Sequence, residues 1–132
     1  MSIHDAFMGL LNLSPPLTIH QGRVPASPTF PYVLVTGFVP RVSERGVTRV
    51  PQGSVAKYRT TVVGTSEASV RVIAGRVTAA VEGAKIAAAG FSVGRVESLL
   101  NDLPILRDDD VSTDSMNVFY AVLEWQFTIS PT

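Results

Sequence analysis

The stretch that decides the fold is "KYRTTVVGTSEASVRVIAGRVTAAVEG", residues 57–83. Up to Gly64 it is rich in β-branched residues, which predicts a β-strand. From Val70 onward its apolar residues recur three and four positions apart, which predicts an amphipathic helix with one buried face. The residues on that face are Val70, Ile73, Ala74, Val77, Ala80, Val81 and Ala84. The stretch therefore predicts a strand and a helix joined at a glycine.

The junction "GTS", residues 64–66, is compatible with either a phosphate site or a capped helix. A P-loop requires G-x-x-x-x-G-K-[ST], but no lysine follows Gly64 until Lys85. The three spaced glycines of a dinucleotide site are also missing. We therefore expect Thr65 or Ser66 to accept a hydrogen bond from a free N–H of the first turn. Gly83 is expected to follow the end of this helix.

The remaining elements are predicted from apolar periodicity and from proline and glycine positions. An N-terminal helix begins with the capping-box variant S-x-x-D at residues 2–5 and ends before Pro15. Its apolar face carries Ile3, Phe7, Leu10 and Leu11. Strands are predicted at 17–20, 32–38, 57–64, 91–97 and 117–129, and the strand at 32–38 is apolar enough to be covered on both faces.

The last of these strands has two different faces. Its core face carries Phe119, Ala121, Leu123, Trp125, Phe127 and Ile129. Its other face is apolar at the start, with Val118 and Tyr120, and polar at the end, with Glu124 and Gln126. We expect the first half of this second face to be covered by a local element or by another subunit.

Residues 39–56 form an extended loop or arm with two prolines, two glycines and scattered valines. A hairpin is predicted here, with its tip at Arg45-Gly46 and with Val42 and Val47 on its two sides. A loop of this length in a compact domain is often functional, and an insertion without function is the alternative.

Composition excludes several classes of protein. A chain of 132 residues predicts one domain, and eleven basic against eleven acidic residues argue against a dedicated nucleic-acid binder. Without cysteine there is no disulfide, thiolate metal site or cysteine nucleophile. No apolar run approaches the roughly 20 residues of a membrane helix, and no signal peptide is recognised. We expect a soluble protein made in a reducing cytoplasm.

No catalytic, cofactor or metal site is predicted. His4 and His20 have no serine nucleophile motif near them and are expected at the surface. Asp108, Asp110, Ser112 and Asp114 resemble the first four ligand positions of an EF-hand loop. However, Thr113 replaces the glycine of that loop and Phe119 its closing glutamate. Solvated loop acids are the favoured interpretation over a loosely held divalent cation. The acidic cluster consists of Asp108, Asp109, Asp110 and Asp114.

Charges of opposite sign are separated along the chain. Residues 23–59 contain six basic residues and one acidic residue, and residues 97–124 contain seven acidic residues and one basic residue. A neutral chain with such a separation can associate head to tail with its own copies, and such contacts form a ring if the rotation closes. The alternative is that the two segments meet within one subunit.

The sequence resembles the tail terminator family of long-tailed bacteriophages, also called tail-completion or minor tail proteins. The resemblance is carried by "RVPASPTFPYVLVTG" (23–37), by "YRTTVVGTSEASVRVIAGRVTAAVEG" (58–83) and by "PILRDDDVSTDSMNVFYAVLEWQFTI" (104–129). These contain a proline-bounded "PYV" strand, a strand ending at glycine before a helix, and an acidic turn before a long final strand. A proline-rich loop of this length distinguishes the sequence from shorter members of the family.

The resemblance implies an α/β fold of the α+β type, as a single domain over residues 1–132. It implies a mainly antiparallel sheet of four to five strands, with the N-terminal helix and one long central helix on one face, plus an extended loop or hairpin arm. It also implies a virion protein assembled in the host cytoplasm, without cofactor or enzymatic activity. The expected partners are copies of itself in a homohexameric ring, together with the tail tube protein, the head–tail connector protein and DNA passing through without specific contacts.

Three further expectations complete this interpretation. The candidate contacts between subunits or with the tube are Arg41, Arg45, Arg49, Asp108, Asp109, Asp110 and Asp114. A tail tube subunit or head–tail connector is the nearest alternative. A small enzyme or ligand-binding domain is the alternative of another class.

Overall fold

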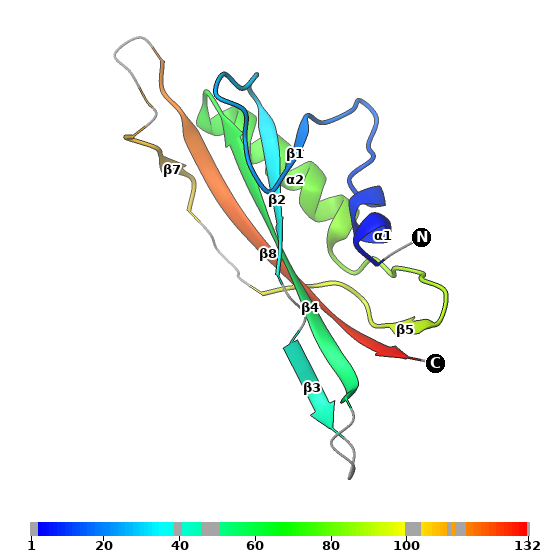
Figure 1. Ribbon diagram of the computed structural model, residues 1–132. Coiled ribbons are helices and arrows are strands. Elements are labelled where there is room, and N and C mark those ends of the chain that lie inside the picture. Colours follow the sequence, from blue (N-terminus) through cyan, green and yellow to red (C-terminus); the bar gives the residue numbers. More distant parts are fainter. Residues whose placement is uncertain are drawn as a thin grey trace.

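The structure is a computed structural model that describes residues 3–38, 41–45, 51–99, 104–110, 112 and 116–131, with only the backbone at 41–45 and 51–52. Its two helices and eight strands are shown in Figure 1. In chain order they are α1 (Ile3–Gly9), β1 (Ile19–Gln21), β2 (Tyr32–Gly37), β3 (Arg41–Arg45), β4 (Pro51–Gly64), α2 (Glu67–Val81), β5 (Phe91–Val93), β6 (Glu97–Ser98), β7 (Leu106–Arg107) and β8 (Phe119–Pro131).

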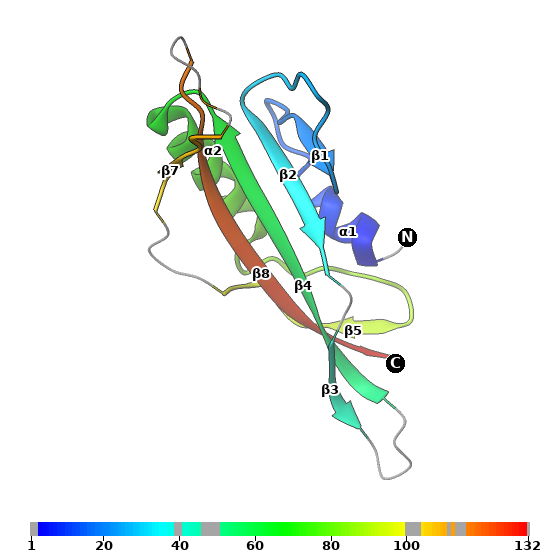
Figure 2. The same ribbon diagram turned by 60° about the vertical axis from the view of Figure 1, so that its left-hand side comes forward.

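One sheet contains all the strands, and its centre is the antiparallel pair β4 and β8. The strand order is β1-β2-β4-β8-β5, while β3 pairs with β4, and β6 and β7 pair with β8. The β4–β8 pairing runs from Ser54 opposite Ile129 to Gly64 opposite Phe119. Figures 1 and 2 show β3 at one end of β4 and β7 at the opposite end.

The sheet is mixed and larger than the mainly antiparallel four- to five-stranded sheet expected from the sequence. The difference in direction comes from β1, which runs parallel to β2 with Ile19 opposite Val33. The apolar pattern of a strand does not encode the direction of its neighbour, so this feature was not visible in the sequence. Much of the difference in number comes from strands of two or three residues, such as β6 and β7, which are too short to show a period.

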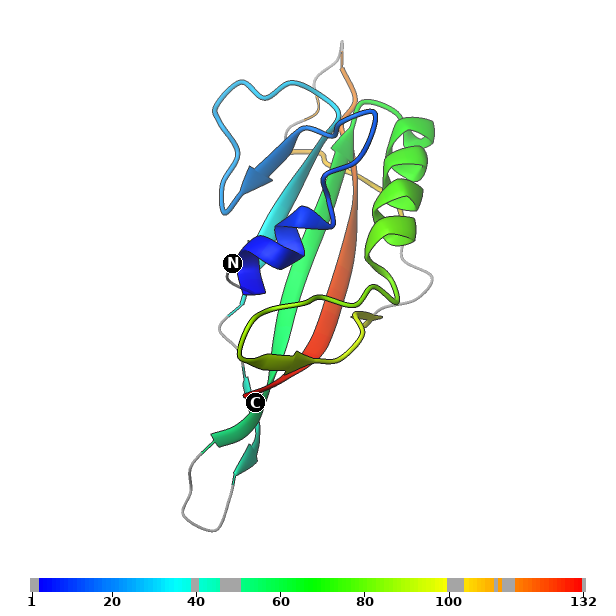
Figure 3. The same cartoon turned by 90° about the vertical axis from the view of Figure 1, so that its right-hand side faces the viewer.

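Both helices lie on the same face of the sheet, as expected (Figure 3). The helix α2 begins after Ser66, whose side chain accepts a hydrogen bond from the backbone N–H of Ser69 at 3.1 Å. Gly83 follows the helix with a φ of 73°, a left-handed conformation that glycine adopts without steric cost. The capping interpretation of the junction at 64–66 is therefore confirmed.

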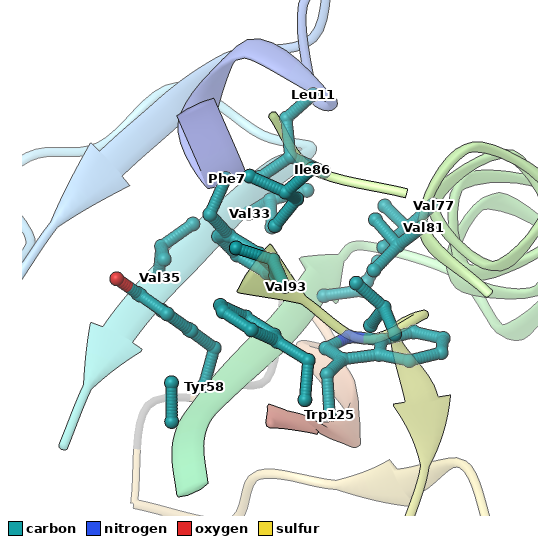
Figure 4. Close-up of a cluster of buried hydrophobic side chains, with 14 of the residues drawn as sticks. Phe7, Leu11, Val33, Val35, Tyr58, Val77, Val81, Ile86, Val93 and Trp125 are labelled. Atoms are coloured by element: carbon teal, nitrogen blue, oxygen red, sulfur yellow. The ribbon is translucent and has the colours of Figure 1, made fainter. Parts of the chain in front are cut away.

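The core forms between the two helices and alternate residues of the sheet (Figure 4). Phe7 of α1 stacks on Tyr58 of β4 with ring centroids 4.0 Å apart. Trp125 of β8 is buried, and its indole N–H donates to the hydroxyl of Thr60, which is also buried, at 3.0 Å. The predicted core face of the last strand is confirmed, since Ala121, Trp125, Phe127 and Ile129 are all buried and Phe119 and Leu123 pack against them.

The strand expected at 91–97 is interrupted at Gly94. A β-carbon at Gly94 would lie 2.4 Å from the hydroxyl oxygen of Thr128, so a side chain there would force Thr128 of β8 to shift. Beyond Gly94 the backbone turns toward the segment after α2, where Val96 N–H donates to the carbonyl of Ala84. Pairing with β8 resumes only at Glu97, and the expected strand is therefore two short ones, β5 and β6.

The arm is a hairpin of β3 with residues 51–55 of β4, and this name is used below. Arg45 pairs with Pro51 and is therefore a strand residue and not part of the expected tip Arg45-Gly46; Gly46 and Val47 lie outside the described residues. The burial of β2 also differs from expectation, because Val33 and Val35 are buried whereas Leu34, between them, is only partly buried. Only one face of β2 is fully covered.

We predict that Thr60→Val lowers the free energy of unfolding by about 1–3 kcal/mol, because the buried indole N–H of Trp125 loses its acceptor. Thr60→Ser, which keeps the hydroxyl, should retain most of the stability. Thr61→Val, one residue along on the other face of β4, should change stability by less than about 0.5 kcal/mol. Urea unfolding followed by tryptophan fluorescence measures all three, and equal losses in Thr60→Val and Thr61→Val would contradict the role of this hydrogen bond.

Candidate interaction surface

The face of the sheet opposite the helices is the candidate functional surface. Its side chains change character along β4, since Thr61 and Val63 lie toward α2 whereas Lys57 and Arg59 lie toward the arm. The neighbouring strands follow the same gradient in register. The outward residues of β2 and β8 are Tyr32, Leu34, Thr36, Tyr120, Val122, Glu124, Gln126 and Thr128.

A hollow of about 620 Å³ lies at the Gly64 end of this helix-free face, and we call it the sheet hollow. Its floor combines aromatic, aliphatic and hydroxyl side chains from three adjacent strands, and its rim is formed by residues 107–110. The floor residues are Tyr32, Leu34, Thr61, Val63 and Tyr120. This combination of a largely apolar floor and an acidic rim suits a segment with apolar and basic side chains.

The rim is held in place by hydrogen bonds to the start of β8. Arg107 pairs with Phe119 in the sheet, and Asp108 N–H donates to the carbonyl of Val118 at 2.7 Å. Ser112 adds a second link, because its hydroxyl accepts from Val118 N–H at 2.9 Å. On the second face of the last strand, Val118 is buried whereas Tyr120 and Val122 are only partly buried.

The rim also affects the chemistry of the hollow. The pKa of the Tyr32 hydroxyl is raised above its ordinary value of 10.0, mainly by burial and secondarily by the negative charge of Asp108. Asp109 forms an ion pair with Arg107, and Asp108 accepts from the backbone N–H of Asp110 at 3.2 Å. Three carboxylates against one guanidinium leave the rim with a net negative charge.

A second cluster on the same face brings opposite charges together. Glu124 is bound by Lys57 at 3.0 Å and by Arg59 at 3.3 Å, and both cations lie 5.3 Å from the ring centre of Phe38. The pKa of Glu124 lies below its ordinary value of 4.5, chiefly because Lys57 donates a hydrogen bond to the carboxylate. The basic and acidic segments of the sequence therefore meet within one subunit at Glu124.

The candidate contact residues of the two segments lie far apart. Arg41 and Arg45 belong to the arm, and Arg49 and Asp114 fall outside the described residues. Asp108, Asp109 and Asp110 form the rim at the other end of β4. Arg41 lies opposite Val55 and Arg107 lies level with Gly64, which places nine residues, or about 30 Å at 3.3 Å per residue, between the two levels.

Both histidines were expected at the surface, and only His4 is exposed. His4 is exposed as expected, and its ring nitrogens contact the Tyr58 hydroxyl at 3.2 Å and the Gln21 side-chain oxygen at 2.9 Å. His20, expected at the surface, is partly buried because it packs edge-on against Tyr32 at 5.4 Å. Within the described residues, no three His, Asp or Glu side chains are grouped so as to hold a metal ion.

Sequence reasoning missed the sheet hollow and the Glu124 cluster. Both depend on the register of β2, β4 and β8, which places residues far apart in the sequence beside one another. The available signal was the change from apolar to polar along the second face of β8, which indicated that a local element or another subunit covers its first half. It could not show which residues of β2 and β4 share that face.

The chain is similar to known proteins in fold and not in sequence. It matches no protein-family model, and no curated protein matches it in sequence. Among solved structures, its fold is similar to that of a chain in the virion of a native gene transfer agent (GTA) particle. That likeness has a TM-score of 0.68 at 14% identity and covers 98% of this chain and 95% of the other. In the described part of the chain, no helix is long and apolar enough to cross a membrane.

We predict that Glu124→Gln lowers the free energy of unfolding at pH 7 by about 1 kcal/mol, because Lys57 and Arg59 lose their carboxylate partner. A carboxyl whose pKa is lowered in the folded state stabilises the protein above its unfolded pKa, and this contribution is lost as the pH falls through the folded value. The difference between the two proteins should therefore disappear in acid, below pH 4.5. Urea unfolding across this pH range measures it, with exposed Glu82→Gln as the control; a difference independent of pH would contradict the assignment.

Proposed function

We propose that this chain is a structural protein of a phage-like particle. The observation that carries the proposal is the likeness of fold to a chain of a gene transfer agent virion, which extends over nearly the whole of both chains. A likeness confined to one supersecondary motif would cover a smaller share of each chain. The shared part here includes the strands and helices of the whole domain.

Within that class we propose the role of tail terminator, a protein that forms a ring ending the tail tube and joining it to the head connector. The motif order described above supports this role, as does the position of the basic arm and the acidic rim at opposite ends of β4. A subunit with complementary surfaces at its two ends offers head-to-tail contacts, which form a closed ring when the rotation permits. The ring we propose is a homohexamer at the neck end of the tail, assembled in the host cytoplasm.

The proposed partners follow from that position. One side of the ring meets the tail tube protein, the other meets the head–tail connector protein, and DNA passes through the centre with few and unspecific contacts. The role is structural, so we propose no enzymatic activity and no cofactor. The arginines of the arm serve contacts between subunits in this proposal, because valines alternate with them and a hydrated channel wall gains nothing from valine side chains.

A tail tube subunit or a head–tail connector is the second candidate, because such proteins share related combinations of sheet and helix. Removing the protein from the particle distinguishes these roles. Particles without a terminator should carry tubes of unregulated length, particles without the tube subunit should carry no tube, and particles without the connector should accumulate separate heads and tails. Negative-stain electron microscopy of the particles gives the answer directly.

We predict that deleting residues 43–53 leaves a folded protein that does not complete tails. The deletion removes most of β3 and the first three residues of β4, whereas the pairing of β4 with β8 begins at Ser54. Circular dichroism and urea unfolding should therefore remain close to those of the full chain, and complementation of particles lacking the protein should fail. Normal tails from a folded deletion variant would refute the role of the arm.

We also predict that the purified chain binds duplex DNA with a Kd no tighter than about 10⁻⁵ M at physiological salt, since affinity for DNA depends on net positive charge and this chain has none. A filter-binding titration over a range of salt concentrations measures this. Tight binding that prefers one sequence over another would move the chain to the class of nucleic-acid-binding proteins.

A further inference from the structure

The sheet hollow and the arm are complementary in chemistry. The floor of the hollow is largely apolar, and its rim carries three aspartates against one arginine. In the sequence, residues 41–50 contain three arginines against one glutamate, together with three valines. The rim and this segment therefore carry net charges of opposite sign, and both the hollow and the segment combine charged with apolar residues.

The arm cannot reach the hollow of its own chain. Both are attached to β4, a continuous strand that holds them about 30 Å apart by its rise per residue. The arm also points away from the hollow, extending beyond the body of the sheet (Figures 1 and 2). An arm that binds such a hollow must therefore come from another molecule.

We propose that the sheet hollow binds the arm of a second copy of this chain. The apolar floor packs against the arm, and Asp108 and Asp110 meet its arginines, while Arg107 already neutralises Asp109. Exposed ion pairs contribute only about 0–1 kcal/mol each, so the charges set the register of the arm and the apolar floor supplies most of the affinity. This contact depends on the proposed function in one respect only, which is that it needs a second copy of the chain.

The cysteine-free sequence allows this contact to be tested covalently. One cysteine is placed on the floor by Thr61→Cys, and a second on the arm by Val42→Cys or, separately, by Ser43→Cys. The two arm variants sample two adjacent positions of β3. A disulfide requires α-carbons within about 7 Å, and Thr61 is separated from Ser54, which lies opposite Val42, by about 23 Å along β4, so no bond can form within one chain.

The expected result is a ladder of covalent oligomers on a non-reducing denaturing gel after mild oxidation of one of these double-cysteine proteins. Thr61→Cys alone should give no ladder. The matched control combines the same arm cysteine with Ala79→Cys on the exposed side of α2, and it should give no ladder either. Changing Asp108, Asp109 and Asp110 to lysine should lower the yield of the ladder about tenfold, and adding Arg41→Glu and Arg45→Glu should restore part of it.

The outcomes separate this inference from the proposed function. A ladder from the floor cysteine, sensitive to the charge changes, supports the contact even if the protein fails to complete tails, in which case only the tail role is refuted. A gel that shows covalent dimers and no larger species supports the contact but contradicts the ring. A ladder from the Ala79 control that equals the Thr61 ladder, or no ladder from either arm position while the protein still completes tails, overturns the inference and leaves the tail role intact.

Discussion

The register between β4 and β8 is the constraint on which the rest of the structure depends. It fixes Tyr58 opposite Trp125 and Thr60 opposite Leu123, so that alternate residues of both strands meet the helices. The intervening residues are then forced onto the opposite face, where Arg59 lies opposite Glu124. A slip of one residue would expose the tryptophan and bury the charged residues, which makes any other register unfavourable.

The same pairing gives the molecule two chemically different ends. The antiparallel pair is longer than the region covered by the helices, so β4 continues past the core and forms the arm together with β3 (Figures 1 and 3). At its other end, residues 107–110 lie beside the start of β8 and form the acidic rim. The continuous strand β4 therefore keeps the arm and the acidic rim at opposite ends of the sheet, while Lys57 and Arg59 meet Glu124 between them.

Much of the local structure could be read from the sequence, and much of the tertiary arrangement could not. The two faces of β8 and the cap at Ser66 follow from periodicity and from side-chain chemistry within a few residues. The direction of β1, the break at Gly94 and the sheet hollow depend on contacts between distant segments, such as the approach of Gly94 to Thr128. The charges showed that two segments were complementary, but only the strand register shows which pairs meet at Glu124 and which are held apart.

The strand β3 has a consequence for the behaviour of the protein at high concentration. In the described part of the chain it pairs with β4 alone, so its outer edge presents backbone N–H and C=O groups that neighbouring molecules can pair with. Its sequence, Arg-Val-Ser-Glu-Arg, is mostly charged or polar, and its register with β4 shifts twice within five residues. Charges and irregular edges both hinder the stacking of strands into fibrils. The composition and the irregular register of this hairpin therefore both act against pairing between its exposed edge and other molecules.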